Sequence, residues 1–312
     1  MEAVALNKKT FGAIFRTEWP LYLFIAPSIV VTILFAYLPM FSNVIAFMNY
    51  DITAGWMGLA SPWSGFANFT KMFHDEQFWP LVWRTFYYSA LRLVTGQPAP
   101  FILALLINEV RNHQFKRTVQ TIFYLPHFVS WVTIASLSYW FLTTDTSGII
   151  NNVRQMLGAD NRIIFMKFPS NFPWVLAITG IIKEAGWGTI IYLAAISGVD
   201  AQLYEAARID GAGRWKQFVH VTFPSILPTT VIMLIFSFGG LFASNFDQIF
   251  NLQNPMIKYD TNTINVYVYY LGVQSGKYSG AAALGLFQGI INATIMLGVN
   301  WFARRVSGHG FF

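Results

Sequence analysis

The sequence predicts an all-α integral membrane protein with six transmembrane helices. Its composition, the spacing of its charges and the length of its apolar stretches lead to this prediction. The chain has 312 residues, of which 55% are hydrophobic and 11% are charged. Soluble domains carry about 25% charged residues, so this chain has too few to cover a soluble protein's surface. Intrinsic disorder is excluded as well, because disordered chains are poor in apolar residues.

Six apolar regions lie between the clusters of charged residues. A helix needs roughly 20 apolar residues to cross a bilayer, and four stretches of 26 to 32 residues carry no formal charge. Two further segments are interrupted, one by Arg92 and the other by the adjacent pair Lys183 and Glu184. The expected helices cover residues 20–48, 84–108, 119–143, 173–199, 224–248 and 280–303. Such long runs do not fit a membrane β-barrel, whose segments alternate over about ten residues.

The distribution of Lys and Arg predicts which ends of these helices face the cytoplasm. Eleven of these residues lie in the terminal segments and connections on one side, and seven are spread over three longer loops on the other. Since basic residues gather in cytoplasmic loops, both termini are expected in the cytoplasm. The net charge of +6 therefore needs no nucleic-acid partner. The expected organisation is a cytoplasmic segment 1–19, one transmembrane domain 20–303 with short helices in its external loops, and a cytoplasmic tail 304–312.

The sequence lacks the motifs for thiol chemistry, for nucleotide phosphate binding and for metal binding. It contains no Cys, which excludes disulfides and thiol catalysis. A phosphate-binding loop needs the pattern GxxxxGK[ST], but the pair Gly276-Lys277 lacks the upstream glycine and is followed by Tyr278. The consecutive acidic and histidine residues at 74–76 cannot converge on a metal from one regular face. We therefore expect no catalytic residue, no metal site and no cofactor bound by this chain.

The cytoplasmic connection 200–228 carries the most informative pattern. It reads DAQLYEAARIDGAGRWKQFVHVTFPSILP. Good helix formers at its start give way to Gly211, which weakens a helix and permits a left-handed turn. A second apolar pattern begins at Phe218 and leads to Pro224 at the entry to the next span. This pattern predicts two short helices joined by a turn, too polar to cross the membrane.

This connection resembles the EAA loop of inner-membrane permeases in binding-protein-dependent ABC importers, through the string EAARIDGA at 205–212. Further similar strings follow the family's order: LYLFIAPSIVVTILFAYLPMFSNVIAF at 21–47, FYLPHFVSWV at 123–132 and GWGTIIYLAAISGVDAQLYEAA at 186–207. Together they resemble the sugar-type branch that handles oligosaccharides derived from polysaccharides. The resemblance implies the type I importer permease (MetI-like) fold.

In that family the EAA loop, here 200–224, forms a coupling helix that docks onto a separate ATPase subunit. The resemblance implies docking roles for Glu205, Ala206 and Ala207 and a turn at Gly211. The small side chains of the two alanines allow another helix to come close. Arg208 and Asp210 are further candidates for this contact, with a solvated surface charge as the alternative for each.

The resemblance also implies the partners and the location of the chain. Half of the translocation path would come from a second, homologous permease subunit. Two ATPase subunits would bind ATP and Mg, and an extracytoplasmic solute-binding protein would deliver an oligosaccharide. The chain itself would be a non-catalytic, multi-pass protein of the bacterial cytoplasmic membrane.

The substrate path is expected in the fourth and fifth spans. An ionisable residue in mid-helix usually faces the protein interior or a watery cavity. Glu184 and Trp187 are three residues apart and share a helix face. A carboxylate can form hydrogen bonds with sugar hydroxyls, and an aromatic ring can pack against the apolar face of a sugar. In the family these spans line the cavity, and Ser244, Asn245 and Asp247 fall near the corresponding stretch. A structural ion pair or packing between subunits remains the alternative for these residues.

Two other classes of function compete with an importer subunit. The first is an autonomous secondary transporter or channel, which would work without ATP or partners. The second is a polytopic membrane enzyme, which would need convergent acid, base or metal groups that the sequence does not offer.

Overall fold

The computed structural model describes residues 11–55, 58, 60–239 and 246–307. Within this part of the chain the structure is helical, and the only β pairing is a single bridge between Met48 and Trp63. Five helices are long and apolar enough to cross a membrane, and a sharply bent pair supplies a sixth crossing if it counts as one span. The prediction of an all-helical membrane fold is confirmed.

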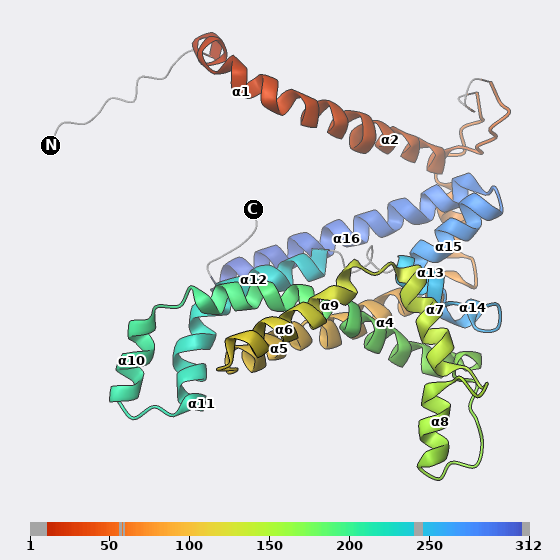
Figure 1. Cartoon of the computed structure of the whole chain (residues 1–312). Helices are drawn as coiled ribbons and strands as arrows, with labels where there is room; N and C mark the ends of the chain where they lie inside the picture. The colour runs from red at the N-terminus through yellow and green to blue at the C-terminus, as the bar shows by residue number, and fades with distance from the viewer. Residues whose placement is uncertain (1–10, 56–57, 59, 240–245, 308–312) are drawn as a thin grey trace.

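The helix expected first in the chain stands apart from the others. It combines α1 (Phe11–Thr32), a π-helical turn η1 (Ile33–Tyr37), α2 (Leu38–Met40) and η2 (Phe41–Phe47). Figure 1 shows α1 and α2 separated from the remaining helices along most of their length. Only the far end, η2, packs extensively on the body, against α16 (Tyr278–Ser307) and α3 (Ala67–Phe73). Most of this apolar helix is therefore not buried by the other described residues, and Phe24 is 84% exposed.

The body is built around α9 (Phe172–Ser197). This helix packs against α4 (Phe78–Gly96), α5 (Pro98–Asn108) and α12 (Phe223–Gly239). Half of its most apolar window is buried, against 17% or less in the other candidate spans.

Two glycines let the neighbours of α9 come close. A Cβ atom on Gly186 would lie 1.9 Å from the backbone oxygen of Phe123, and one on Gly188 would lie 2.7 Å from Cβ of Pro100. Small residues of this kind allow helix backbones to touch.

The third expected span, 119–143, is sharply bent. It consists of α6 (His113–Tyr124), η4 (Leu125–Phe128) and α7 (Trp131–Leu142), and the two halves meet at 103°. Pro126 lies in the turn before the break, and Ser130 caps α7 by accepting a hydrogen bond from the Thr133 amide at 3.2 Å. The carbonyl groups that lack helical partners at the break accept hydrogen bonds from Lys183, as described below. The sequence prediction of a span at 119–143 did not include this bend, because the partner that stabilises the break is remote in the chain.

The other predicted spans agree with the structure to within a few residues, with two exceptions at their starts. The second span begins at Phe78 rather than 84. The fifth begins at Arg214 rather than 224, because α11 (Arg214–Gln217) and η7 (Phe218–Thr222) lead directly into α12. The predicted end of the fifth span at 248 falls within a separate helix, α13 (Phe246–Leu252).

Short elements occupy the two ends of the bundle. At one end lie α3, α8 (Ile149–Met156), α14 (Lys258–Thr261), α15 (Ile264–Tyr269) and η8 (Tyr270–Gln274), which are the short helices expected in the external loops. At the opposite end α10 (Ala201–Ile209) and α11 form a projecting hairpin (Figure 1).

Candidate functional site

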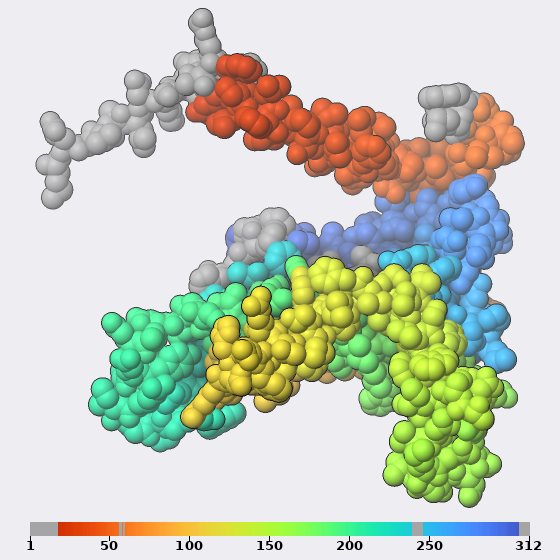
Figure 2. Space-filling view, viewed as in Figure 1, coloured from red at the N-terminus to blue at the C-terminus, as the bar shows by residue number. Residues whose placement is uncertain are grey.

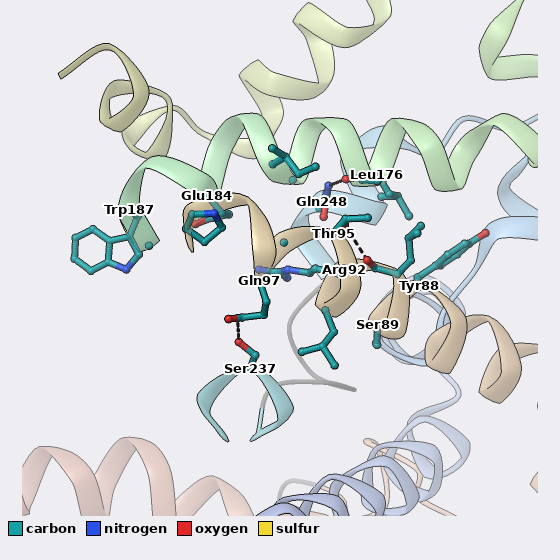
Figure 3. Close-up of a pocket in the computed structure, with 18 of the residues that line it drawn as sticks. Tyr88, Ser89, Arg92, Thr95, Gln97, Leu176, Glu184, Trp187, Ser237 and Gln248 are labelled. Atoms are coloured by element: carbon teal, nitrogen blue, oxygen red, sulfur yellow. Dashed lines mark hydrogen bonds between the residues drawn. The ribbon is translucent and has the colours of Figure 1, made fainter. Parts of the chain in front are cut away.

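A cavity of about 310 Å³ lies among α4, the start of α5, α9, α12 and α13. Its walls combine apolar side chains such as Leu176 and Ile249 with polar and aromatic ones (Figure 3). The polar and aromatic lining residues are Tyr88, Ser89, Arg92, Thr95, Gln97, Glu184, Trp187, Phe236, Ser237 and Gln248. This mixture is typical of small-molecule sites, where a few polar groups orient a ligand against apolar walls.

Glu184 lines this cavity and has a partner that the sequence prediction missed. Its Oε2 atom lies 3.0 Å from Nδ1 of His127, in the turn before the helix break. Both side chains are about one-third exposed, at 33% for Glu184 and 29% for His127. No local pattern links two residues 57 positions apart, so only the packing of η4 on α9 reveals the pair.

Trp187 shares the face of Glu184, as the helical spacing predicts. Its ring stacks on His127 with centroids 5.0 Å apart and an interplanar angle of 11°. Tyr124 adds a third, nearly parallel ring, 6.0 Å from Trp187. The indole remains 46% exposed, so an apolar ring face and a carboxylate lie side by side at the rim of the cavity.

Lys183 points to partners of its own, as expected for a residue adjacent to Glu184 on a helix. Its Nζ atom donates to the backbone oxygens of His127 and Val129, each at 2.6 Å. The residue is 7% exposed. These two carbonyls flank the helix break and lack regular helical partners. Lys183 therefore fastens the bent span to α9, and its role is structural.

Arg92 and Gln97 approach the cavity from α4 and the turn that follows it. Figure 3 shows the Arg92 side chain extending toward Gln97 and the Glu184 side of the cavity. The Gln97 amide nitrogen donates to the Ser237 hydroxyl on α12, and that hydroxyl donates to the Met233 carbonyl at 2.9 Å. These contacts connect α4 to α12 across the cavity.

The remaining residues expected on the path lie at or before the start of α13. Ser244 and Asn245 are outside the described residues. Asp247 is exposed and is not among the residues lining this cavity. Its neighbour Gln248, 4% exposed, does line it and donates to the Leu176 oxygen at 2.8 Å. The segment expected to line the path thus contributes Gln248 to the cavity, a residue that no sequence pattern indicated.

The loop expected to couple to an ATPase forms the α10–α11 hairpin. Asp200 caps α10 by accepting a hydrogen bond from the Gln202 amide at 2.9 Å. Gly211 ends it with φ of +74°, and the Ala212 and Gly211 amides donate to the oxygens of Ala207 and Arg208 at 2.8 and 3.0 Å. This is the Schellman arrangement, which favours glycine at the left-handed position.

The surface of this hairpin consists of polar groups that surround three exposed apolar side chains. Glu205, Ala206, Arg208, Asp210 and Gly211 are exposed and Ala207 is half-buried. Leu203, Ile209 and Trp215 are 49%, 87% and 74% exposed. Exposed apolar groups in such numbers mark contact surfaces. Arg208 and Asp210 form no salt bridge within the described chain, so both alternatives for them stay open.

Few contacts tie the hairpin to the body. The Tyr204 hydroxyl lies 3.0 Å from that of Thr222, and Arg214 forms an exposed ion pair with Glu109 at 3.1 Å. Figure 2 shows the hairpin, coloured green to teal, projecting at the end of the molecule away from α8. The candidate site thus has two parts, a cavity inside the helix bundle and the exposed surface of the hairpin at one end.

Comparison with known proteins gives consistent results. Residues 96–308 match the family model described as binding-protein-dependent transport system inner membrane component. The chain is 37% identical over 301 residues to Protein LplB of Bacillus subtilis, covering 96% of this chain and 93% of the relative. It is 39% identical to the polygalacturonan/rhamnogalacturonan transport system permease protein YteP of the same organism, covering 94% of this chain and 90% of the relative.

Two solved structures are similar over nearly the whole chain. One is a bacterial ABC transporter involved in the import of the acidic polysaccharide alginate, with 35% identity and a TM-score of 0.85 over 94% of this chain and 98% of that one. The other is a bacterial alginate ABC transporter in complex with an alginate pentasaccharide-bound periplasmic protein. It shows 34% identity and a TM-score of 0.88, and it covers 97% of this chain and all of that one.

Proposed function

The chain belongs to the family of binding-protein-dependent transport system inner membrane components, and we propose that it forms half of the path by which an ATP-driven importer carries an oligosaccharide across the bacterial cytoplasmic membrane. The observation that carries this proposal is the cavity in which Glu184, paired with His127, stands beside the exposed ring of Trp187. A carboxylate can bind sugar hydroxyls while the ring packs on the apolar face of the sugar. The similarity to a polygalacturonan/rhamnogalacturonan permease and to an alginate importer favours the same class of cargo.

The topology that fits this function has six crossings and both termini in the cytoplasm. It counts the bent pair α6–α7 as one span. The α10–α11 hairpin then lies in the cytoplasm and the short helices α8, α14 and α15 lie outside (Figure 1). The excess of Lys and Arg on the hairpin side supports this orientation.

The α10–α11 hairpin is the proposed docking surface for the ATPases. Two ATPase subunits would bind ATP and Mg, and one of them would receive α10 in a groove. Ala206 and Ala207 permit close approach, Glu205 offers an acceptor, and the turn at Gly211 fixes the direction of the second helix. The exposed Ile209 and Trp215 supply the apolar contacts that such an interface needs.

A second, homologous permease is the proposed partner within the membrane. Trp187 is 46% exposed at the cavity rim, so this chain alone leaves its cavity open. The first helix, which stands away from the body (Figure 1), leaves room for helices of another subunit. A solute-binding protein would deliver the cargo from outside. The alginate transporter, solved in complex with a pentasaccharide-bound periplasmic protein, supports this role.

The test of this function is purification followed by reconstitution. The tagged chain, extracted from native membranes in mild detergent, should bring with it an ATPase, a second permease and a solute-binding protein. The purified complex in liposomes should take up oligosaccharide only when ATP and the binding protein are supplied. Recovery of the chain alone, with sugar flux in the absence of ATP, would instead support the autonomous transporter.

A further inference from the structure

We propose that a second cavity, at the end of the helix bundle opposite the α10–α11 hairpin, binds the headgroup of an anionic phospholipid, with its phosphate group between Lys71 and Lys277. This inference goes beyond the proposed function, because it concerns the membrane around the transporter and not the cargo. It rests on the position of this end cavity relative to the membrane spans, on the charges that line it and on its apolar wall.

The end cavity has a volume of about 420 Å³ and lies between two segments that are far apart in the sequence. One segment runs from Tyr50 through α3 to the start of α4, and the other runs from α15 to the start of α16. The Tyr50 amide donates to the Ser279 hydroxyl at 2.9 Å and joins the two segments. Figure 2 shows them, in orange and blue, in contact at the end of the molecule away from the hairpin.

This cavity is separate from the one that Glu184 lines. The two cavities share no described lining residue. Leu81 of the end cavity and Tyr88 of the other cavity both lie on α4, seven residues and therefore about 10 Å apart along the helix. A ligand of the end cavity thus does not occupy the proposed cargo site.

The end cavity lies at the level where membrane spans begin. The second and the last candidate spans begin at Phe78 and Tyr278, and both residues line the cavity. Lys277 directly precedes the last span, and Lys71 lies on the short helix α3 before the second. Trp79 is 63% exposed, and an exposed Trp at the end of a span is typical of the membrane interface. Lipid headgroups occupy this level of a bilayer.

The charges that line the end cavity favour an anion. The charged lining residues are Lys71, Asp75 and Lys277, so two lysines and one aspartate give a formal charge of +1. Neither lysine ammonium has a hydrogen bond or an ion pair with another described residue. The Asp75 carboxylate, in contrast, already accepts a hydrogen bond from the Gln77 amide at 2.8 Å. Basic pockets between membrane helices bind the headgroups of anionic lipids.

The walls of the end cavity fit the part of a lipid where polar and apolar groups meet. Burial and the nearby charge of Asp75 raise the pKa of Tyr267, so its phenol stays protonated and can donate a hydrogen bond to a phosphate oxygen. The buried apolar side chains of the wall are those of Met72, Phe78, Leu81 and Leu284. A soluble anion would use the lysines alone, whereas a lipid gains a second contact from this wall.

The experiment titrates lipid onto the complex that is purified with the chain. After delipidation in detergent, native mass spectrometry measures the binding of phosphatidylglycerol, which carries one negative charge, and of phosphatidylcholine, which carries no net charge. The tightest site of the wild type should bind phosphatidylglycerol at least about fivefold more tightly, the factor expected for one basic residue near a membrane surface. Inorganic phosphate in excess should not displace the lipid, because it cannot use the apolar wall.

Variants of the lining charges should shift this binding in both directions. Lys71→Gln and Lys277→Gln should each weaken phosphatidylglycerol binding about fivefold, and the double variant should lose the preference. Lys277→Arg should keep it, since a guanidinium also binds phosphate. Asp75→Asn should strengthen binding, because it removes the negative charge while its side-chain oxygen can still accept from the Gln77 amide. Lys167→Gln is the matched control, because Lys167 is exposed, precedes the start of α9 and does not line the cavity.

Three results would overturn this inference. The first is equal binding of the two lipids by the wild type, or an unchanged preference in the assembled double variant. The second is displacement of the lipid by inorganic phosphate, which would show an anion site that needs no lipid. The third is weaker binding of the solute-binding protein by the double variant with lipid binding unchanged, which would show a protein contact instead. The titration needs no transport, so a failure of the proposed function would not change its result.

Discussion

The centre of α9 and the α10–α11 hairpin are both polar interruptions of an apolar chain, yet their polar groups behave in opposite ways. At Lys183 and Glu184 the partners come from the turn before the helix break, more than 50 residues away. In the hairpin, the hydrogen bonds at Asp200 and Gly211 stay within a few residues, and the side chains point to solvent. The polar groups of the first region find their partners within this chain, whereas the side chains of the second remain exposed, as the proposed docking to a partner requires.

This difference predicts that changes in α9 damage folding or cargo handling, while changes in the hairpin damage coupling. Membrane depth explains the contrast. In the bilayer each polar group needs a protein partner, but outside the bilayer water can satisfy the polar groups.

The largest expected effect is that of Lys183→Met. The substitution keeps the length of the side chain but leaves the oxygens of His127 and Val129 without their donor, which we expect to cost about 2 kcal/mol or more. The unfolding temperature and the yield of the purified complex should both fall. Lys167→Met, at an exposed lysine, is the control; equal unfolding temperatures for the two variants would show that Lys183 does not hold the break.

Glu184→Ala comes next. It removes the carboxylate from the cavity and should reduce ATP-driven uptake about tenfold, the loss expected for one charge-assisted hydrogen bond. Assembly and basal ATPase activity should remain nearly unchanged. Asp247→Asn, at an exposed acid that does not line the cavity, should transport normally. If the two variants were equally impaired, the path would have to include the start of α13.

Gly211→Ala should have a smaller and different effect. A residue with a Cβ atom at φ of +74° costs roughly 1–2 kcal/mol, although nothing lies within 4 Å of that position. We expect a several-fold loss of cargo-stimulated ATPase activity without a change in cargo binding. Gly213→Ala is the matched control, because Gly213 has φ of −69° and also has open space around it. Normal coupling in both variants would argue against a role for the turn.

Arg214→Gln is expected to do least. Its ion pair with Glu109 joins two side chains that are 73% and 58% exposed, and such pairs contribute at most about 1 kcal/mol. The unfolding temperature should change by no more than about 4 °C. A larger change would mean that the hairpin is held to the body more firmly than its contacts indicate.

Local features were predictable from the sequence because their causes are local. The length of the apolar runs indicated the membrane helices, and the glycine at 211 indicated the turn that ends α10. The spacing of Glu184 and Trp187 placed them on one face, and both line the cavity. The bend inside the span expected at 119–143 was not predicted, because the apolar character is continuous there and the hydrogen bonds from Lys183 to the break come from a remote helix.

By itself, the sequence determined the class of protein, the position of most spans and the turn of the α10–α11 hairpin, because hydrophobic length and turn chemistry act over neighbouring residues. Only the tertiary structure decided which polar groups meet inside the membrane. The pairing of His127 with Glu184, the anchoring of the bent span by Lys183 and the placement of Arg92 and Gln248 in one cavity all depend on helices distant in the chain. The physical reason is that a buried polar group must find a partner in space, and the position of that partner in the sequence is not constrained.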